Sequence, residues 1–353
     1  MFEKYVYVIL FGLLAIIFSG KSQIWQTNVK RKKKICIFLF LFIIIQNGFR
    51  DYLHSTNDTY NYLINYKDLL NVPLADLLKS FSLVSDDYAS RDPGFYIFVK
   101  LTQYICTNFR FLLVVVASII AYPLCKMLYR YSTSVAGIFL GMTLYEALFA
   151  GFFDTGMRQT LAMGITFNAF LMQQEGKSWK LWTPLVLLAY TSHTSSLIFL
   201  PLYFLPKVKN QSLLMKCAII VTPLIFVLAK PIIALLGSGT IFEAYAVNST
   251  DNLGTPVFSA MVILLALLMK FFDKRIKSFY RYYQVSFSAM LMALVLTPAS
   301  WIDSNFIRLT FYYLVFLMPI LSVFIDAASL KNLKNRSIIY IGVAGALIML
   351  SIK

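Results

Sequence analysis

Long apolar runs, separated by short polar segments, follow one another along almost the whole chain. A helix that crosses the hydrocarbon core of a bilayer, about 30 Å thick, needs about 20 mainly apolar residues. Twelve runs approach this length, and they lie at residues 4–20, 35–49, 110–129, 134–150, 158–173, 179–191, 195–206, 213–236, 256–272, 283–298, 306–325 and 337–352. The pattern predicts an all-α fold: a polytopic transmembrane helical bundle with about 11–12 spans, forming a single integral membrane domain over residues 1–353.

One polar segment, residues 50–93, is much longer than the others. Asn57 and Asp58 can cap a helix in which apolar side chains recur at helical spacing over residues 62–70, and residues 74–84 form a second amphipathic piece. Amphipathic helices of this kind lie in the plane of a membrane surface. We therefore expect a large outside loop at residues 50–93, with its helices on the outer leaflet.

Two further stretches do not fit a simple crossing. Residues 94–106 are apolar but short and interrupted by Lys100, which favours an interfacial or re-entrant helix and extends the external loop to residues 50–107. Residues 179–206 could form one long helix, but that choice would put the main basic clusters on opposite sides of the membrane. A broken pair of short segments, with residues 192–196 at its outer tip, is therefore favoured.

The composition excludes a soluble globule, since 59% of the 353 residues are hydrophobic and the mean hydropathy is +0.71. The formal net charge is +16. With the N-terminus outside and every run crossing, 21 of the 32 Lys and Arg residues lie on the inner side, including the clusters Lys30–Lys34 and Lys270–Arg281. This bias follows the positive-inside rule. The cations therefore indicate orientation and contact with anionic lipid head groups rather than nucleic-acid binding.

Arginine is over-represented at the opposite, outer ends of the runs. Arg158 begins an apolar run, and a guanidinium costs about 2.5–3.5 kcal/mol at the centre of a membrane helix and less near its ends, so it needs a partner. Asp154, one turn earlier, is the simplest partner, and an anionic ligand is the alternative. The other outer arginines, with neighbouring carboxylates in Asp51, Asp92 and Asp303, are Arg50, Arg91 and Arg308. Because a guanidinium binds phosphate through two donors, an anion-binding pocket is expected.

Two more ionisable residues lie near the predicted outer side. His193 is flanked by hydroxyl residues in a gap between two apolar segments, where it suits either proton transfer or a structural hydrogen bond. Glu146 lies within a predicted span and is either a paired intramembrane carboxylate or part of the same site. The sequence contains no nucleotide-binding glycine pattern, HExxH or CxxC, so we expect neither a cofactor nor a metal.

Five short motifs follow one another between residues 47 and 320. They are Arg50 with Asn57–Tyr62, then Asp92–Phe95, Gly156–Ala162, Ser192–Ser196, and Arg308–Tyr313 leading to Pro319. In this order and spacing the chain resembles the EpsG/Wzy-type polysaccharide polymerases, which make O-antigen or exopolysaccharide in bacterial envelopes. Two positions depart from that pattern. Asp92 stands where the family often has Glu, and the glycine usual just before the first acidic residue is missing from residues 54–57.

The resemblance implies a GT-C-like glycosyltransferase that joins undecaprenyl-pyrophosphate-linked repeat units on the outer, periplasmic face of the bacterial cytoplasmic (inner) membrane. It assigns the pyrophosphates to Arg50, Arg91, Arg158 and Arg308. It makes His193 or Asp58 the base that takes the proton from the acceptor hydroxyl as it attacks the anomeric carbon. Sugar contacts would come from Tyr60, Tyr62, Asp92 and Asp154, although the two tyrosines also suit an interfacial aromatic belt. The expected partners are lipid-linked glycans, membrane lipid and a chain-length regulator protein.

Three other functions stay open from the sequence. An O-antigen ligase-like transferase uses nearly the same chemistry, and a deletion strain would then lose all capping rather than chain length alone. A non-enzymatic flippase for lipid-linked oligosaccharides would carry cations around a midplane cavity and show an internal repeat, whereas the arginines here lie towards one face. A membrane acyltransferase would need a histidine with cytoplasmic access, and His193 is predicted on the other side.

Overall fold

The computed structural model describes residues 2–20, 29–53, 58–79, 92–236, 254–301, 306–328 and 333–351. Over these ranges every regular element is helical, which confirms the expected all-α fold. In chain order they are α1 (Phe2–Ser19), α2 (Val29–Gly48), α3 (Asp58–Leu69), α4 (Leu74–Lys79), α6 (Pro93–Ile105), α7 (Phe109–Tyr131), α8 (Val135–Leu144), the π-helix η1 (Tyr145–Phe149), α9 (Ala150–Thr155), α10 (Met157–Gln174), α11 (Trp179–Ser192), the 3-10 helices η2 (Thr194–Tyr203) and η3 (Leu205–Lys207), α12 (Gln211–Leu236), α14 (Gly254–Phe271), α15 (Asp273–Phe279), α16 (Tyr283–Leu296), the 3-10 helix η4 (Thr297–Trp301), α17 (Ile307–Leu314), α18 (Leu317–Ala328) and α19 (Leu333–Ser351).

Each predicted apolar run coincides with one of these helices or with consecutive helices. Four segments of the described chain are long and apolar enough to cross a membrane: Phe109–Tyr131, Val135–Thr155, Gln211–Leu228 and Tyr283–Trp301. A fifth crossing results if α17 and α18, bent by 58° at their junction, form one span, and Tyr5–Ser19, Phe258–Phe271 and Asn335–Met349 are shorter apolar helices. The chain is therefore a polytopic membrane protein. Fewer described helices reach full span length than there are predicted runs, because polar residues or breaks interrupt the others.

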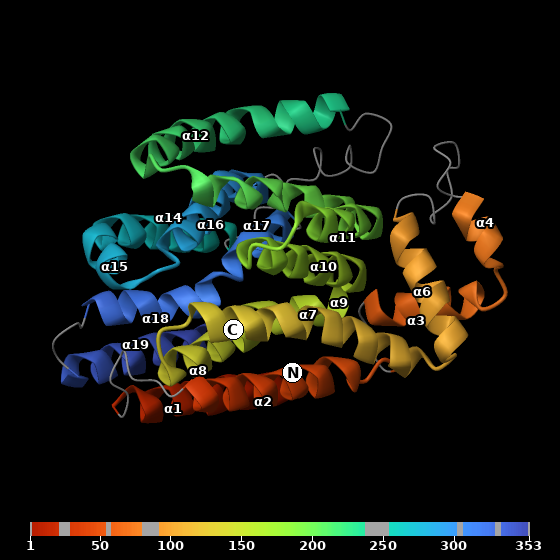
Figure 1. The fold of residues 1–353 in the computed structure, drawn as a ribbon, viewed down its shortest axis with the longest axis horizontal. Coiled ribbons are helices and arrows are strands. Elements are labelled where there is room, and N and C mark those ends of the chain that lie inside the picture. The colour runs from red at the N-terminus through yellow and green to blue at the C-terminus, as the bar shows by residue number, and fades with distance from the viewer. Residues whose placement is uncertain are drawn as a thin grey trace.

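Most of the long helices lie side by side along the longest dimension of the molecule (Figure 1). The short helices α3, α4 and α6 gather at one end, on the right of Figure 1. The start of α2, which carries Lys30–Lys34, and α15, which carries Lys274, Arg275 and Lys277, lie at the opposite end. The fold thus separates the helices of the predicted external loop from the lysine-rich end.

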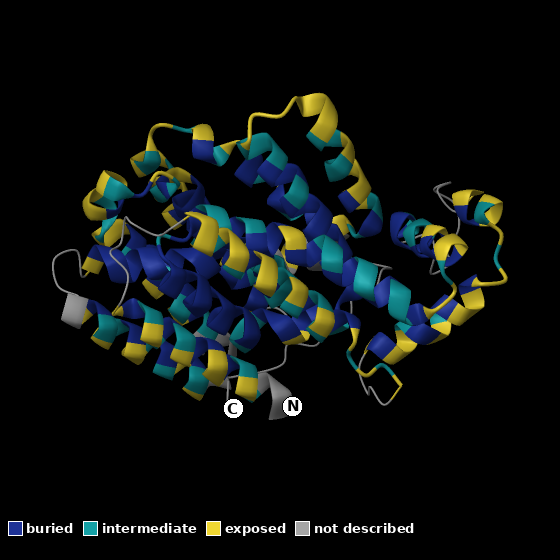
Figure 2. Ribbon diagram, turned by 60° about the horizontal axis from the view of Figure 1, so that its bottom comes forward, coloured by how far each residue is buried: buried dark blue, intermediate teal, exposed yellow. Residues whose placement is uncertain are grey.

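Helix α8 packs against α1 and α18, and all its residues are buried. Two glycines permit close packing of α18 against it, because a Cβ at Gly137 would lie 2.5 Å from Ser322 and one at Gly141 would lie 2.6 Å from the Met318 carbonyl oxygen. Buried residues fill the interior, and exposed ones follow the outer helices (Figure 2). Many exposed side chains of α2 and α12 are large and apolar, such as Phe38 and Val227, which suits contact with lipid tails.

The predicted break within residues 179–206 is confirmed. Helix α11 ends at Ser192, and His193 has an extended backbone (φ −166°, ψ 121°) before the chain continues as η2. Residues 93–105 form α6, a helix of 13 residues that is too short to cross a bilayer. The break turns the chain at His193, and the short α6 brings Asp92 towards the same end.

Arg336 differs from the other cations of the basic end because it is completely buried. Its Nε lies 2.8 Å from Oδ1 of Asp326, and the side chains of both residues are 0% exposed. The same guanidinium donates to the Ser19 carbonyl oxygen and to Oγ of Ser134. Arg336 is therefore an internal tie between α1, α8, α18 and α19 and not a cation at the membrane surface.

Candidate functional site

The chain between α9 and α10 forms the base of the candidate site. Gly156 is not helical (φ −86°, ψ 57°), so α9 ends at Thr155 and a new helix begins at Met157. Arg158 therefore lies in the first turn of an 18-residue helix. The first backbone N–H groups of a helix lack partners within the helix, and its N-terminus carries a partial positive charge. Both features favour an anion at this position.

Arg158 joins three separate parts of the chain. Its Nη1 lies 2.9 Å from Oδ2 of Asp92, whose side chain is 3% exposed, and its Nε lies 3.5 Å from the hydroxyl of Tyr62. The predicted pairing of Arg158 with Asp154 is therefore wrong in its partner, because the ion pair reaches across the fold to the segment before α6. Asp92 and Tyr62, predicted as sugar contacts, are brought to the arginine.

A close contact between α6 and α11 fixes the position of Asp92. A Cβ added to Gly94 would collide with the Thr191 hydroxyl and lie 2.7 Å from the Thr191 carbonyl carbon. Only a glycine allows this approach, since backbone atoms cannot rotate away as a side chain can. The contact sets Asp92, two residues before Gly94, beside the end of α11, where His193 follows Thr191 by two residues.

Gly94→Ala is expected to weaken folding and to reduce activity together. Overpacking typically costs about 1–3 kcal/mol, and relief here requires α6 to move, which carries Asp92 away from Arg158. The measurement is the thermal unfolding temperature in detergent, alongside an assay of the protein's activity. Gly342→Ala is the matched control, because nothing lies within 4 Å of a Cβ there, and it should leave both quantities unchanged or slightly raise stability. A Gly94→Ala protein that behaves like this control would contradict the packing argument.

His193 caps the start of η2 with its ring. Its Nδ1 accepts the backbone N–H of Ser195 at 3.2 Å and lies 2.8 Å from Oγ of the same residue. The Ser195 hydroxyl in turn lies 3.1 Å from the Tyr312 hydroxyl. Since Nδ1 is an acceptor, the neutral ring carries its proton on Nε2. This geometry favours a donor role for His193 and weighs against its predicted role as the base.

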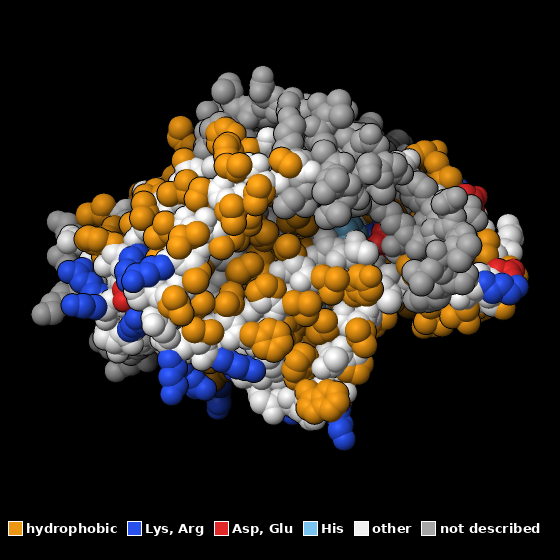
Figure 3. All heavy atoms as spheres, turned by 90° about the horizontal axis from the view of Figure 1, so that it is seen from above, with side chains coloured by type: hydrophobic (Ala, Val, Ile, Leu, Met, Phe, Trp, Pro, Cys, Tyr) orange, Lys and Arg blue, Asp and Glu red, His pale blue; other side chains and the backbone are white. Residues whose placement is uncertain are grey.

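Helix α17 brings Arg308, another of the predicted arginines, to the same region. The Arg308 carbonyl oxygen accepts a hydrogen bond from Nε2 of Gln159, next to Arg158, at 3.1 Å. The Arg308 guanidinium lies 5.9 Å from the ring centre of Phe152, and no described carboxylate pairs with it. One turn along α17, Tyr312 is close enough to Asp92 to interact with it electrostatically. Figure 3 shows histidine, acidic and basic side chains close together at this part of the surface, away from the lysine-rich end.

A second arginine group lies beside the first. Nη1 of Arg50 is 3.9 Å from Oδ1 of Asp154, and the hydroxyl of Thr59 at the start of α3 donates to the Asp154 carbonyl oxygen at 3.1 Å. Nε of Arg50 is buried and makes no hydrogen bond within the described chain. Because α3 contacts Asp154 through Thr59 and Arg158 through Tyr62, it links the two groups.

Arg110 belongs to this second group, and the sequence analysis missed it. Its Nη1 donates to the carbonyl oxygen of Arg50 at 3.1 Å, and its guanidinium stacks 4.8 Å from the ring centre of Tyr52. No carboxylate in the described ranges pairs with it. A signal was present, since Arg110, like Arg158, is an arginine in the first turn of an apolar helix.

A buried polar chain continues from Arg50 into the bundle. Nε2 of Gln46 donates to Oε2 of Glu146 at 2.8 Å, and Nδ2 of Asn47 donates to the Tyr145 hydroxyl at 3.0 Å. Glu146 is 0% exposed and lies in the π-helix η1, a form that is rare and frequent at functional sites. Of the two predicted roles for Glu146, the structure supports a hydrogen-bonded intramembrane carboxylate adjoining the site.

A family model described as the EpsG family matches residues 33–353. The chain belongs to the EpsG family. Membership confirms the resemblance drawn from the motifs and supports a polysaccharide polymerase-type function in the broad sense. No curated protein and no solved structure matches the chain.

The EpsG-family motifs converge to different extents. The contacts given above bring most of the predicted residues into one region. These residues are Arg50, Tyr62, Asp92, Asp154, Arg158, His193 and Arg308. Asp58 and Tyr60 are exposed on α3, with Tyr60 45% exposed, and each lies next to Thr59 in sequence. Arg91 lies outside the described residues, as do His54 and Asp303. Within the described ranges no group of three His, Cys, Asp or Glu side chains could hold a metal ion.

Proposed function

We propose that this EpsG-family protein is a polymerase that joins undecaprenyl-pyrophosphate-linked oligosaccharide repeat units by glycosyl transfer. The reaction would take place on the periplasmic, outer face of the bacterial cytoplasmic membrane. The observation that carries the proposal is the arginine group at the N-terminus of α10. There Arg158 is held by Asp92 and Tyr62, and the next residue, Gln159, donates to the Arg308 carbonyl oxygen. Such a group suits a diphosphate at membrane depth.

Two lipid-linked substrates must bind at once, and the two arginine groups suit two pyrophosphates. We assign the donor pyrophosphate to Arg158 and Arg308, with Nε2–H of His193 as a further donor. We assign the acceptor pyrophosphate to Arg50 and Arg110. The buried, unpaired Nε of Arg50 supports this assignment, because an unsatisfied buried donor costs about 1–3 kcal/mol and an anion would satisfy it.

The chemistry then needs little more than charge stabilisation and one base. The acceptor sugar hydroxyl attacks the anomeric carbon of the donor, the new C–O bond forms, and the bond to the pyrophosphate oxygen breaks. The lipid pyrophosphate leaves as an anion, and donors already positioned around it stabilise the developing charge. The hydroxyl proton passes to a carboxylate. Asp58 is the candidate base, since Thr59 beside it contacts Asp154.

The direct test uses the full-length protein in vesicles with a purified lipid-linked repeat unit. We expect a ladder of lengthening glycans and one released lipid pyrophosphate per linkage formed. Transfer to a lipid A core without lengthening would indicate a ligase instead. Movement of the intact lipid across the vesicle membrane without new linkages would indicate a flippase.

His193 provides a second test, because its two nitrogens can be mimicked separately. His193→Asn keeps a good helix cap and should fold normally, yet it loses the Nε2 donor and should lower turnover about 100-fold. His193→Gln extends an amide N–H towards the Nε2 position and should retain about ten times more activity than His193→Asn. If both variants are equally inactive while folding normally, the donor role is wrong and a base role regains support.

A further inference from the structure

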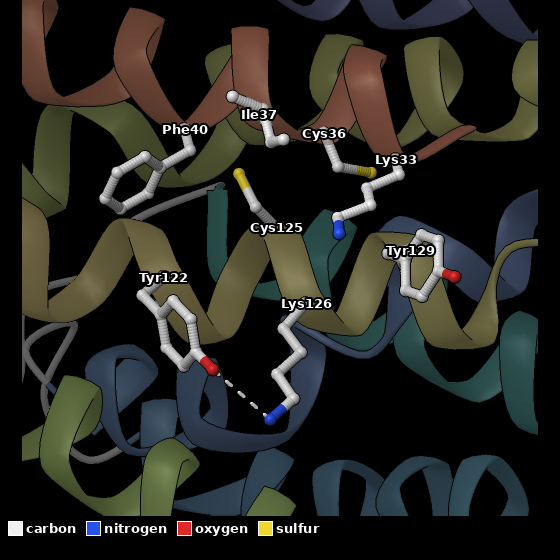
Figure 4. Close-up of a pocket in the computed structure, with 8 residues that line it drawn as sticks. All are labelled: Lys33, Cys36, Ile37, Phe40, Tyr122, Cys125, Lys126 and Tyr129. Atoms are coloured by element: carbon white, nitrogen blue, oxygen red, sulfur yellow. Dashed lines mark hydrogen bonds between the residues drawn. The ribbon is translucent and has the colours of Figure 1, made fainter. Parts of the chain in front are cut away.

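A groove opens on the lateral surface of the helical bundle between α2 and α7, towards the lysine-rich end. It has a volume of about 560 Å³, and its walls include Ile37, Phe40, Tyr122 and Cys125 (Figure 4). Ile37 and Tyr122 are 50% and 49% exposed, so the groove faces outward rather than into the bundle. A surface of this composition in a membrane protein contacts lipid tails.

Two lysines line this apolar groove. Lys33 extends from α2 towards α7, and Lys126 lies on α7 with its Nζ 3.3 Å from the Tyr122 hydroxyl. Each is a point charge close to apolar walls. The groove therefore combines an apolar floor, which suits an acyl chain, with lysines at its rim, which suit an anionic head group.

Nearby carboxylates balance only part of the positive charge at this rim. Lys33 lies in the first turns of α2, where the helix N-terminus is itself positive, and no described carboxylate pairs with it. Lys126 lies 2.7 Å from Glu175, but this carboxylate also contacts Arg130 at 3.6 Å. One negative charge thus serves two cations, and Lys33 remains unbalanced.

We propose that the groove binds one anionic phospholipid of the adjoining leaflet. The phosphate would lie between Lys33 and Lys126, and an acyl chain would follow Ile37 and Phe40. A soluble anion would gain from the lysines alone, whereas the apolar floor favours a lipid. Basic pockets between membrane helices are suited to anionic head groups.

The position of the groove gives the lipid a structural consequence. The far end of α2 leads to Arg50, and Arg110 lies in the first turn of α7. The two helices that form the groove therefore also position the second arginine group. A lipid that fills the groove braces this helix pair. Binding therefore stabilises the fold independently of whether the polymerase assignment is correct.

The test uses purified full-length protein in nanodiscs of phosphatidylethanolamine with increasing phosphatidylglycerol. Native mass spectrometry counts retained phosphatidylglycerol, and thermal unfolding reports stabilisation. Lys33→Gln should weaken retention of one lipid about fivefold, and Ile37→Trp should block it by filling the groove. The matched controls are Lys34→Gln and Phe38→Trp, which change the next residue along α2 and do not line the groove.

The site is supported if the wild type and both controls retain one phosphatidylglycerol while Lys33→Gln and Ile37→Trp lose it. Equal loss from Lys33→Gln and Lys34→Gln would overturn it, because the lysines would then act only through general surface charge. Unchanged retention in Lys33→Gln and Ile37→Trp would also overturn it. Since none of these readouts involves sugar transfer, failure here leaves the proposed polymerase activity unaffected.

Discussion

Arg158→Lys is expected to abolish polymerisation almost as completely as Arg158→Ala. Arginine reaches Asp92 through Nη1 and Tyr62 through Nε at the same time, and both contacts orient the guanidinium at the start of α10. A lysine ammonium keeps the charge but cannot hold both partners in one plane, nor offer two parallel donors to a phosphate. Removing one positioned donor of this kind typically lowers turnover about 100- to 1000-fold. The measurement is glycan length in a complemented deletion strain, followed by the vesicle assay.

Three comparisons separate this loss from a folding defect. Each variant must reach wild-type expression and elute as the wild type does in detergent. Arg281→Lys, at an exposed arginine between α15 and α16, is the matched control and should leave chain length unchanged. Asp92→Asn keeps the shape of the partner and should reduce activity less than either change at Arg158. Normal chain length from Arg158→Ala would remove that residue from the site.

Arg336→Met is expected to cause the largest loss of stability. Asp326 would stay fully buried without its counter-ion, and breaking a buried pair in this way costs about 3–5 kcal/mol. The Ser19 carbonyl oxygen and the Ser134 hydroxyl would lose their donor as well. We expect a sharp fall in folded protein recovered from membranes and in the thermal unfolding temperature.

An exposed ion pair at the same end of the molecule supplies the control. Lys277 lies 2.8 Å from Asp273, with 44% of its side chain exposed, and exposed pairs contribute about 0–1 kcal/mol. Lys277→Met should therefore change stability little. Adding Asp326→Asn to Arg336→Met should recover part of the loss, because the buried charge is then absent. If Arg336→Met is as stable as Lys277→Met, the four-helix tie is not a stabilising element.

The fold was largely predictable, because its main features are local. An apolar run of helical length forms a helix in a membrane whatever its neighbours do, since every backbone polar group must be satisfied within the segment. The break at His193 was also predictable, from the polar residues between two apolar segments and from charge parity. The lengths of the helices were less predictable. Polar side chains such as Asn168 in α10 are tolerated inside a helix because nearby backbone carbonyl oxygens accept their hydrogen bonds.

The sequence proposes members of the candidate site but not the pairs they form. Arg50, Arg158, Arg308 and His193 stood out because each is polar at the edge of an apolar run. The partner of Arg158 was wrong, because sequence proximity favours Asp154 while the fold delivers Asp92 from a different helix. Arg110 was missed, because its significance comes from lying against Arg50, 60 residues away in the chain.

The sequence by itself therefore determined the membrane environment, the helical class, the family and the choice of arginine for the candidate site. Those properties follow from hydropathy, helical spacing and side-chain chemistry, which each segment carries with it. Only the tertiary structure decided that Asp92 rather than Asp154 holds Arg158, that the Ser195 hydroxyl beside His193 meets the Tyr312 hydroxyl, and that Arg336 is an internal tie. These depend on which helices touch, and contacts such as Gly94 on Thr191 arise only when distant segments pack together.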